Sequence, residues 1–425
     1  MIRLLLLLLG SEIVQRQWRW LAALGAIWAL VGLAILIDAL DGSTVIRPHY
    51  FGYLLLLEGL VALAASFLAP ARRSYRLMQA AFLIVPAFVI VMQPPQGNFI
   101  IAMLLGTVLL VDGCFRIASA HVIRFRGWRL AIIGGLVEIL FAIGTLQPWP
   151  TWYEGTIGCN IGALLIVSGL GTVMLARRLR LLPADTPIST LFATRSAPYA
   201  AFAREQGQAV PGELVVHVWT PAGSLGAQAR RPLVDRYVAA IDQKGTISTG
   251  HAALELPPDL YISHYPAVEI ERSPESFGRV LNAGGENDVP GRFLPSYREE
   301  AAGWCEATEH VRFTRFDAQR LRAFWLHYSA NQTYNLTNRN CSSAVAHALD
   351  VALEGALGRS AAPWRASLAA LVTPELWAAG VLRRRAEAMA WTPGLVLDYA
   401  RLLQIVVEPA PAGALSLRLR REPTR

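Results

Sequence analysis

Long apolar runs dominate the first 180 residues of this 425-residue chain, whereas the remainder has the mixed pattern of a globular domain. Six runs stand out, at about 18–38, 50–69, 77–93, 98–120, 128–147 and 156–176. Each is close to the ~20 residues that an α-helix needs to cross the hydrocarbon core of a bilayer. The pattern predicts an all-α, six-helix transmembrane bundle over residues 1–180.

An internal repeat accompanies the apolar runs. The segments LLLEG, LLVDG and LIVSG occupy residues 55–59, 109–113 and 165–169, at steps of 54 and 56 residues. Each segment falls in the second helix of a predicted hairpin. Because repeats of this length indicate one structural unit copied along the chain, we expect three helical hairpins of one design.

Alternating strands and amphipathic helices follow residue 180. A proline-containing stretch over residues 181–211 predicts a linker. We expect strands at 213–219, 236–241, 251–256 and 260–266, and helices at 318–329 and from residues 341, 374 and 393. The pattern predicts an α+β domain with an antiparallel sheet over residues 212–425, ending in a basic tail of seventeen residues.

Arginine is distributed unevenly over the connecting loops. Up to residue 180, 14 arginines stand against seven acidic residues, which gives +7 of the total formal charge of +8. They cluster before the first run and after the second, fourth and sixth, so the positive-inside rule predicts that both termini and the second domain are cytoplasmic. That domain is nearly neutral, with 25 basic residues (39 less 14) against 24 acidic (31 less seven), which argues against a nucleic-acid partner.

The first ten residues contain a leucine run that resembles the apolar core of a signal peptide. No small-residue cleavage site follows it, and arginines at 16 and 19 precede the first long run. We therefore expect this segment to be retained and to lie at the membrane surface.

Candidate chemistry centres on Cys341, which a small, polar segment delivers to the first turn of a predicted helix. Amide groups at a helix start favour a thiolate, and a reducing cytoplasm keeps a thiol free. His251, at the head of a predicted strand, supplies a base. If residues 256–259 form a four-residue hairpin loop, position 255 pairs with 260, and His264 falls opposite His251 and orients it.

Structural explanations exist for the same residues. A cysteine at a helix start is often buried packing, and a strand histidine is often structural. His217, on the strand at 213–219, is a rival base, and Asn340 could hold an oxyanion or cap the helix. The four cysteines, at 114, 159, 305 and 341, have no metal-ligand spacing, so we expect neither a metal nor another cofactor.

Acidic residues interrupt three of the apolar runs. Glu58, Asp112 and Glu138 lie where an ionisable group costs at least ~2.5 kcal/mol unless it is paired or hydrated. Glu58 and Asp112, at equivalent repeat positions, could form a proton-sensing pair. The alternative is a role in helix contacts, with Asp112 paired to Arg116 four residues along.

The order of a Gly-His strand, a second strand and an Asn-Cys helix resembles the circularly permuted papain-like fold over residues 211–355. That group contains lecithin:retinol acyltransferase and permuted relatives of the NlpC-type cell-wall peptidases. The resemblance implies a cysteine hydrolase, with Cys341 as nucleophile, His251 as base and His264 as the third, polar member. Its substrate would be a peptide, another amide or an acyl lipid.

The membrane part resembles the HdeD-like short-repeat proteins, which are associated with acid resistance in bacteria. The segment QWRW at 17–20, the glycine within ALVGLA at 29–34 and the six-run layout carry this resemblance over residues 12–180. Together the resemblances imply a multi-pass protein of the bacterial inner membrane whose partner is the lipid bilayer. The alternative to an enzyme is a stress-response or scaffold protein whose papain-like domain binds a partner, and oligomerisation stays open.

Overall fold

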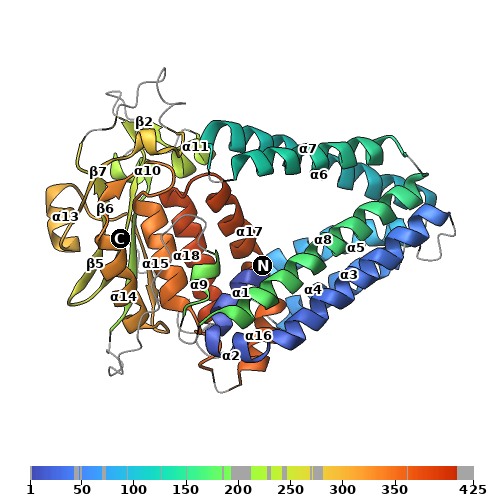
Figure 1. The fold of residues 1–425 in the computed structure, drawn as a ribbon, viewed down its shortest axis with the longest axis horizontal. Coiled ribbons are helices and arrows are strands. Elements are labelled where there is room, and N and C mark those ends of the chain that lie inside the picture. The colour runs from blue at the N-terminus through green and yellow to red at the C-terminus, as the bar shows by residue number, and fades with distance from the viewer. Residues whose placement is uncertain are drawn as a thin grey trace. The chain divides into compact units, whose positions relative to one another are not determined.

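The computed structural model describes two compact units. The helical unit comprises residues 18–118 and 129–178, and the mixed unit comprises residues 1–17, 119–128 and the described part of 179–408. Within these ranges the described residues are 2–42, 47, 50–68, 73–92, 94–125, 127–149, 151–183, 186–192, 212–226, 231–241, 247–268, 270, 281–360 and 362–408. Figure 1 traces the chain through both units.

Long apolar helices make up the helical unit. They are α3 (Trp18–Asp41), α4 (Tyr50–Leu68), α5 (Arg73–Met92), α6 (Pro94–Ile123), α7 (Trp128–Leu146) and α8 (Tyr153–Leu181). Among the described residues, four stretches are long and apolar enough to cross a membrane, at Trp18–Asp41, Gln96–Ile123, Trp128–Leu146 and Tyr153–Leu181. All six predicted runs are therefore helical, and four of these helices could span a membrane by length and composition, which indicates a membrane protein.

The glycine of each sequence repeat lies where two helices touch. A Cβ at Gly59 on α4 would come 2.7 Å from Ile84 on α5, and a Cβ at Gly113 on α6 would come 2.7 Å from the Gly135 carbonyl oxygen on α7. Gly169 on α8 likewise meets α3. Small residues let helix backbones approach closely, so the repeat joins each predicted hairpin to the first helix of another.

Arg116 on α6 holds two of the acidic residues found within apolar runs. Its guanidinium lies 2.8 Å from the carboxylate of Glu138 on α7 and 3.7 Å from that of Asp112, four residues away on α6. The predicted pairing of Asp112 with Arg116 is thus confirmed. The ion pairs bind α6 to α7, while proton sensing stays a prediction.

An antiparallel sheet of order β5-β4-β1-β8 forms the centre of the mixed unit. Its strands are β1 (Leu214–Trp219), β4 (His251–Leu256), β5 (Leu260–Ile262) and β8 (Glu309–Phe313). Two smaller sheets pair β2 (Ala240–Ile241) with β3 (Ile247–Ser248), and β6 (His264–Pro266) with β7 (Val289–Phe293) and β9 (Thr333–Tyr334). Apolar side chains of β1, β4 and β8 are fully buried beneath α15 (Cys341–Leu353) and α18 (Pro393–Val407) (Figure 1).

Shorter helices surround this core. They are α1 (Ile2–Leu9), α2 (Ser11–Arg16), α9 (Ser189–Phe192), α10 (Pro221–Ser224), α11 (Pro232–Tyr237), the 3-10 turn η2 (Gly285–Asn287), α13 (Tyr297–Gly303), α14 (Ala318–Ser329), α16 (Pro363–Leu371) and α17 (Pro374–Ala388). The predicted starts of α14, α17 and α18 are confirmed. Each follows an N-cap aspartate or threonine, and in α17 and α18 a proline occupies the first turn.

Two strand predictions need correction. The expected strand at 236–241 is reduced to Ala240–Ile241, because Pro232 opens a helix that runs to Tyr237. The expected strand at 260–266 divides at Ser263 into β5 and β6, which belong to different sheets.

The leucine-rich helix α1 is buried in the mixed unit, which corrects the expectation that it lies at the membrane surface. Leu4 to Leu8 are all buried, and the carbonyl oxygens of Leu7 and Leu8 accept backbone hydrogen bonds from Gly355 and Leu357 at 3.0 and 2.8 Å. A helix that is apolar on every side needs burial on every side. The structure therefore groups residues 1–17 with the second domain rather than the first.

Most of the predicted linker at 181–211 and the basic tail at 409–425 lie outside the described residues.

Candidate active site

Cys341 occupies the first position of α15, and Asn340 caps that helix. The Asn340 side-chain oxygen accepts the Ser343 N–H at 2.7 Å, and the Ser343 hydroxyl accepts the Asn340 N–H at 2.9 Å. The Asn340 amide nitrogen donates to the carbonyls of Leu336 and Trp391. The capping role is therefore confirmed, and it fixes the position of Cys341 within the first turn.

The Cys341 side chain is buried, with 8% of its surface exposed. Burial raises the pKa of this thiol. The charge of His251 and a hydrogen bond to His251 lower the pKa, as do hydrogen bonds to Ser342 and to the Ala252 backbone, and together they outweigh burial. The net pKa lies below the ordinary value. The Asn340 side chain already accepts the Ser343 N–H, so the N–H groups of Cys341 and Ser342, which lack intrahelical acceptors by the nature of a helix start, can bind a developing oxyanion.

His251 begins β4 directly after Gly250. Gly250 has a φ of 71°, and a Cβ there would collide with the Trp219 carbonyl oxygen, which explains the Gly-His pair. The His251 ring stacks on Tyr265 with 4.0 Å between ring centroids. Burial lowers the pKa of His251, whereas the charge and hydrogen bond of Cys341 and then the charge of Glu300 raise it, for a net increase.

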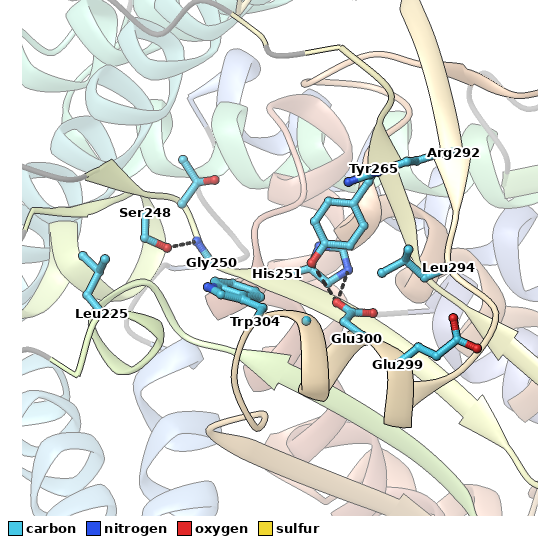
Figure 2. A pocket seen from close by; sticks show the side chains of 12 residues that line it. Leu225, Ser248, Gly250, His251, Tyr265, Arg292, Leu294, Glu299, Glu300 and Trp304 are labelled. Carbon is cyan, nitrogen blue, oxygen red and sulfur yellow. Dashed lines mark hydrogen bonds and ion pairs between the residues drawn. The ribbon is translucent and has the colours of Figure 1, made fainter.

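Glu300 on α13 is the acidic partner of His251, and the sequence did not predict it. Its carboxylate lies 3.3 Å from His251 Nε2 and accepts hydrogen bonds from the hydroxyls of Tyr261, Ser263 and Tyr265 at 2.7, 2.8 and 2.7 Å. Figure 2 shows Glu300 pointing toward His251 and Tyr265. Only 3% of Glu300 is exposed, so these donors replace water around the carboxylate. One sequence signal existed, since the three hydroxyls alternate at 261, 263 and 265, as side chains of a single strand face do.

Nε2 of His251 also lies 2.9 Å from the Ser263 hydroxyl. With Nε2 facing Ser263 and Glu300, the hydrogen bond to Cys341 falls to Nδ1. The imidazole therefore stands between a thiol and a carboxylate, the arrangement in which a histidine moves a proton while its ring is held by a third group.

His264 lies elsewhere because the predicted strand register is wrong by one residue. Leu256 pairs with Leu260, not residue 255 with 260, so the following side chains exchange faces. His264 Nδ1 lies 3.1 Å from the Tyr328 hydroxyl, and its ring contacts Phe293. Burial lowers the pKa of His264 to about 3, with smaller effects from the charges of Arg339 and His251. The residue that meets His251 is the next one along, Tyr265.

The rival base His217 has other contacts. Its Nε2 lies 3.1 Å from the Glu255 carboxylate and its Nδ1 lies 2.9 Å from His310 Nδ1, while its ring stacks on Tyr297. Burial lowers the pKa of His217 to about 3, and the charges of His310 and Arg312 add to the effect. A histidine kept neutral and bound to a glutamate fits a structural role.

A pocket of about 450 Å³ opens beside His251 (Figure 2). His251, Tyr265 and Glu300 line one part of it, Trp304 and Leu294 give it apolar walls, and Arg292 and Glu299 bring opposite charges. His251 is among the lining residues, and Cys341 is not. Within the part of the chain that the structure describes, no group of three or more His, Cys, Asp or Glu side chains could hold a metal ion.

Comparisons of the chain with models of protein families, with curated proteins and with solved structures found no match. The two resemblances therefore rest on the sequence motifs alone. What the mixed unit does has to be argued from the thiol, the imidazole and the carboxylate that the fold brings together.

Proposed function

We propose that the mixed unit is a cysteine hydrolase of the peptidase, amidase or acyltransferase type, with Cys341 as nucleophile and His251 as base. The supporting observation is the buried series from the Cys341 thiol through His251 to the Glu300 carboxylate. In this proposal Glu300 takes the orienting role that the resemblance gave to His264. Its carboxylate stabilises the imidazolium that forms when the thiol gives up its proton.

The reaction follows from these positions. The Cys341 thiolate attacks an amide or ester carbonyl carbon, and the oxyanion binds the first N–H groups of α15. The C–N or C–O bond then breaks as the imidazolium of His251 protonates the leaving group, which leaves a thioester on Cys341. Water, or the hydroxyl or amine of an acceptor, gives a proton to His251 and attacks the thioester, which releases the acyl group and restores the thiol. Water makes the protein a hydrolase, and another acceptor makes it an acyltransferase.

We further propose six membrane crossings with both termini and the mixed unit in the cytoplasm of a bacterium. α1 precedes the first candidate span and packs in the same unit as the residues that follow the last one. The α6–α7 junction belongs to that unit too, because the Ala283 N–H donates to the Ile123 carbonyl at 2.7 Å. Chain segments held in one folded unit lie on one side of a membrane, which supports an even number of crossings before and after this junction. The arginine-rich loops support the cytoplasm as that side.

The proposal is tested by the rate at which iodoacetamide alkylates Cys341 between pH 4 and 10, followed by mass spectrometry of the Cys341 peptide. We expect an apparent pKa well below the reference value of ~8.5 in the parent protein and a return toward it in His251→Ala. His264→Ala serves as the matched control, and its profile should follow the parent. An inert thiol, or one that is indifferent to His251, would exclude the enzyme.

A second candidate is a non-enzymatic stress-response or scaffold protein whose mixed unit binds a partner. It is favoured by the burial of Cys341 and by its absence from the lining of the pocket. This candidate predicts the inert thiol, so the same experiment separates the two.

A further inference from the structure

The helices α16 and α17 expose apolar side chains to the outside of the mixed unit. The exposed fractions are 63% for Trp364, 55% for Leu368, 76% for Val372, 50% for Trp377 and 55% for Val381. Trp364 and Leu368 on α16 and its C-cap residue Val372 are four positions apart, so they form one stripe, and Trp377 and Val381 on α17 form a second. The exposed face of a helix in a soluble domain is normally polar, and a grouped apolar face marks a binding surface.

Arginines accompany both stripes. Arg365 is exposed, with its guanidinium 5.2 Å from the centre of the Trp364 ring, and Arg384 is exposed one turn beyond Val381. Of the two acidic residues on α17, Glu387 is engaged by His347 and Trp391, and Glu375 in the first turn is half-buried. The surface therefore combines tryptophan and aliphatic side chains with positive charge, the composition of segments that lie in a bilayer interface with anionic lipids.

The chain itself brings this surface near a membrane. α1 packs against α16 and α17 and ends at Leu9, and the eight residues 10–17 link it to Trp18, where the first candidate span begins. Eight residues reach at most about 28 Å when fully extended.

The chain that follows the last candidate span packs beside the residues that hold α1. The Ile188 and Ser189 N–H groups donate to the Glu354 carboxylate at 2.8 and 3.3 Å, next to the Gly355 that holds α1. The Gln15 side chain also reaches the Leu182 carbonyl at 3.4 Å. The chain segments before the first candidate span and after the last one thus leave from the part of the mixed unit that carries α1, α16 and α17.

We infer that the exposed faces of α16 and α17 are a docking surface for the bilayer. The tryptophans and aliphatic side chains enter the interfacial region, and Arg365 and Arg384 bind the phosphates of anionic lipids. This inference is independent of the thiol chemistry.

Photo-crosslinking of the full chain in bilayer nanodiscs tests the inference. Val372→p-benzoylphenylalanine places the probe in the apolar stripe, and Leu326→p-benzoylphenylalanine is the matched control, because Leu326 on α14 is 75% exposed. After irradiation in nanodiscs that contain phosphatidylglycerol, we expect lipid adducts at position 372 and none at position 326. Arg365→Gln with Arg384→Gln should reduce the adduct yield at 372 toward that found in pure phosphatidylcholine.

The other outcomes would overturn the docking surface. A cross-link from position 372 to a peptide of this chain, within one molecule or between two, would assign the stripe to a protein contact. Equal lipid labelling at 372 and 326, or no adduct at 372, would show that the stripe has no preference for lipid.

Discussion

Replacing Glu300 with glutamine is the sharpest perturbation of the candidate site, because it removes a charge while nearly preserving shape. In the folded protein one Glu300 oxygen accepts the hydroxyls of Tyr261 and Ser263, and the other accepts the Tyr265 hydroxyl and faces His251. Glutamine offers one oxygen and one NH₂ group. Whichever way the amide turns, at least one buried hydroxyl loses its acceptor, and the imidazolium of His251 loses its counter-charge.

Two magnitudes follow. A buried hydroxyl left without a partner costs about 1–3 kcal/mol, so Glu300→Gln should destabilise the mixed unit by roughly that amount. A hydrogen bond to a charged group contributes about 1.5–3 kcal/mol, and each ~1.4 kcal/mol changes a population tenfold. The thiolate–imidazolium form of Cys341 and His251 should therefore become roughly tenfold to a hundredfold rarer.

Alkylation of Cys341 by iodoacetamide at pH 6 measures this population. The rate should fall at least about tenfold in Glu300→Gln, and the apparent pKa of the thiol should rise. Glu299→Gln is the control, because Glu299 is an exposed neighbour that lines the same pocket, and its rate should match the parent. Since three other cysteines are free, the product is identified in the Cys341 peptide. A folded Glu300→Gln protein with the rate and pH profile of the parent would refute the role of the carboxylate.

Three further results are expected. Burial lowers the pKa of both His217 and His264 to about 3 in the folded protein, whereas the pKa of an unfolded histidine is about 6.5. Their contribution to stability is therefore complete above pH 6.5 and is lost as pH falls toward 3. Thermal unfolding in detergent should show a loss of about 1.4 kcal/mol per pH unit for each histidine, and His217→Gln should reduce that slope. Gly32→Ala should destabilise the helical unit by about 1–3 kcal/mol, because the added Cβ would lie 2.7 Å from the Gly162 carbonyl oxygen. Gly171→Ala is the control and should be neutral, because a Cβ there would have no other atom within 4 Å. Leu8→Ala should lower the free energy of unfolding of the mixed unit by about 2–5 kcal/mol, measured by urea unfolding, because Leu8 is fully buried. An unchanged midpoint would contradict the burial of α1 and favour its original placement at the membrane surface.

The sequence was most informative where a structural requirement is local. Gly250 must precede His251 because the backbone there has a positive φ, and Asn340 must precede Cys341 because α15 needs a cap. Thr392 before a proline marks the start of α18 for the same kind of reason. Each of these signals is complete within about four residues, so a single sequence displays it.

Contacts between distant segments were beyond the reach of the sequence. Glu300 reaches His251 from another element. The alternating hydroxyls at 261, 263 and 265 indicate a polar strand face, but nothing along the chain marks Glu300 rather than Glu299 as its partner. α1 packs on residues near Gly355, at the far end of the chain, although its leucines alone read as a membrane segment. The register after β4 depended on whether its turn holds three or four residues. That single residue decided whether His264 or Tyr265 meets His251.

The cost of the candidate site argues against a purely structural role. A junction between a sheet and a helix that only had to pack would be at least as stable with apolar side chains, since burying charged groups usually costs more than their attraction returns. Here a carboxylate with 3% exposure needs the hydroxyls of Tyr261, Ser263 and Tyr265 as well as His251. This arrangement stabilises one charge state of one imidazole, and that imidazole lowers the pKa of one thiol. A lowered thiol pKa and a raised imidazole pKa beside a pocket are typical of reactive sites, which favours the proposed hydrolase over the binding scaffold.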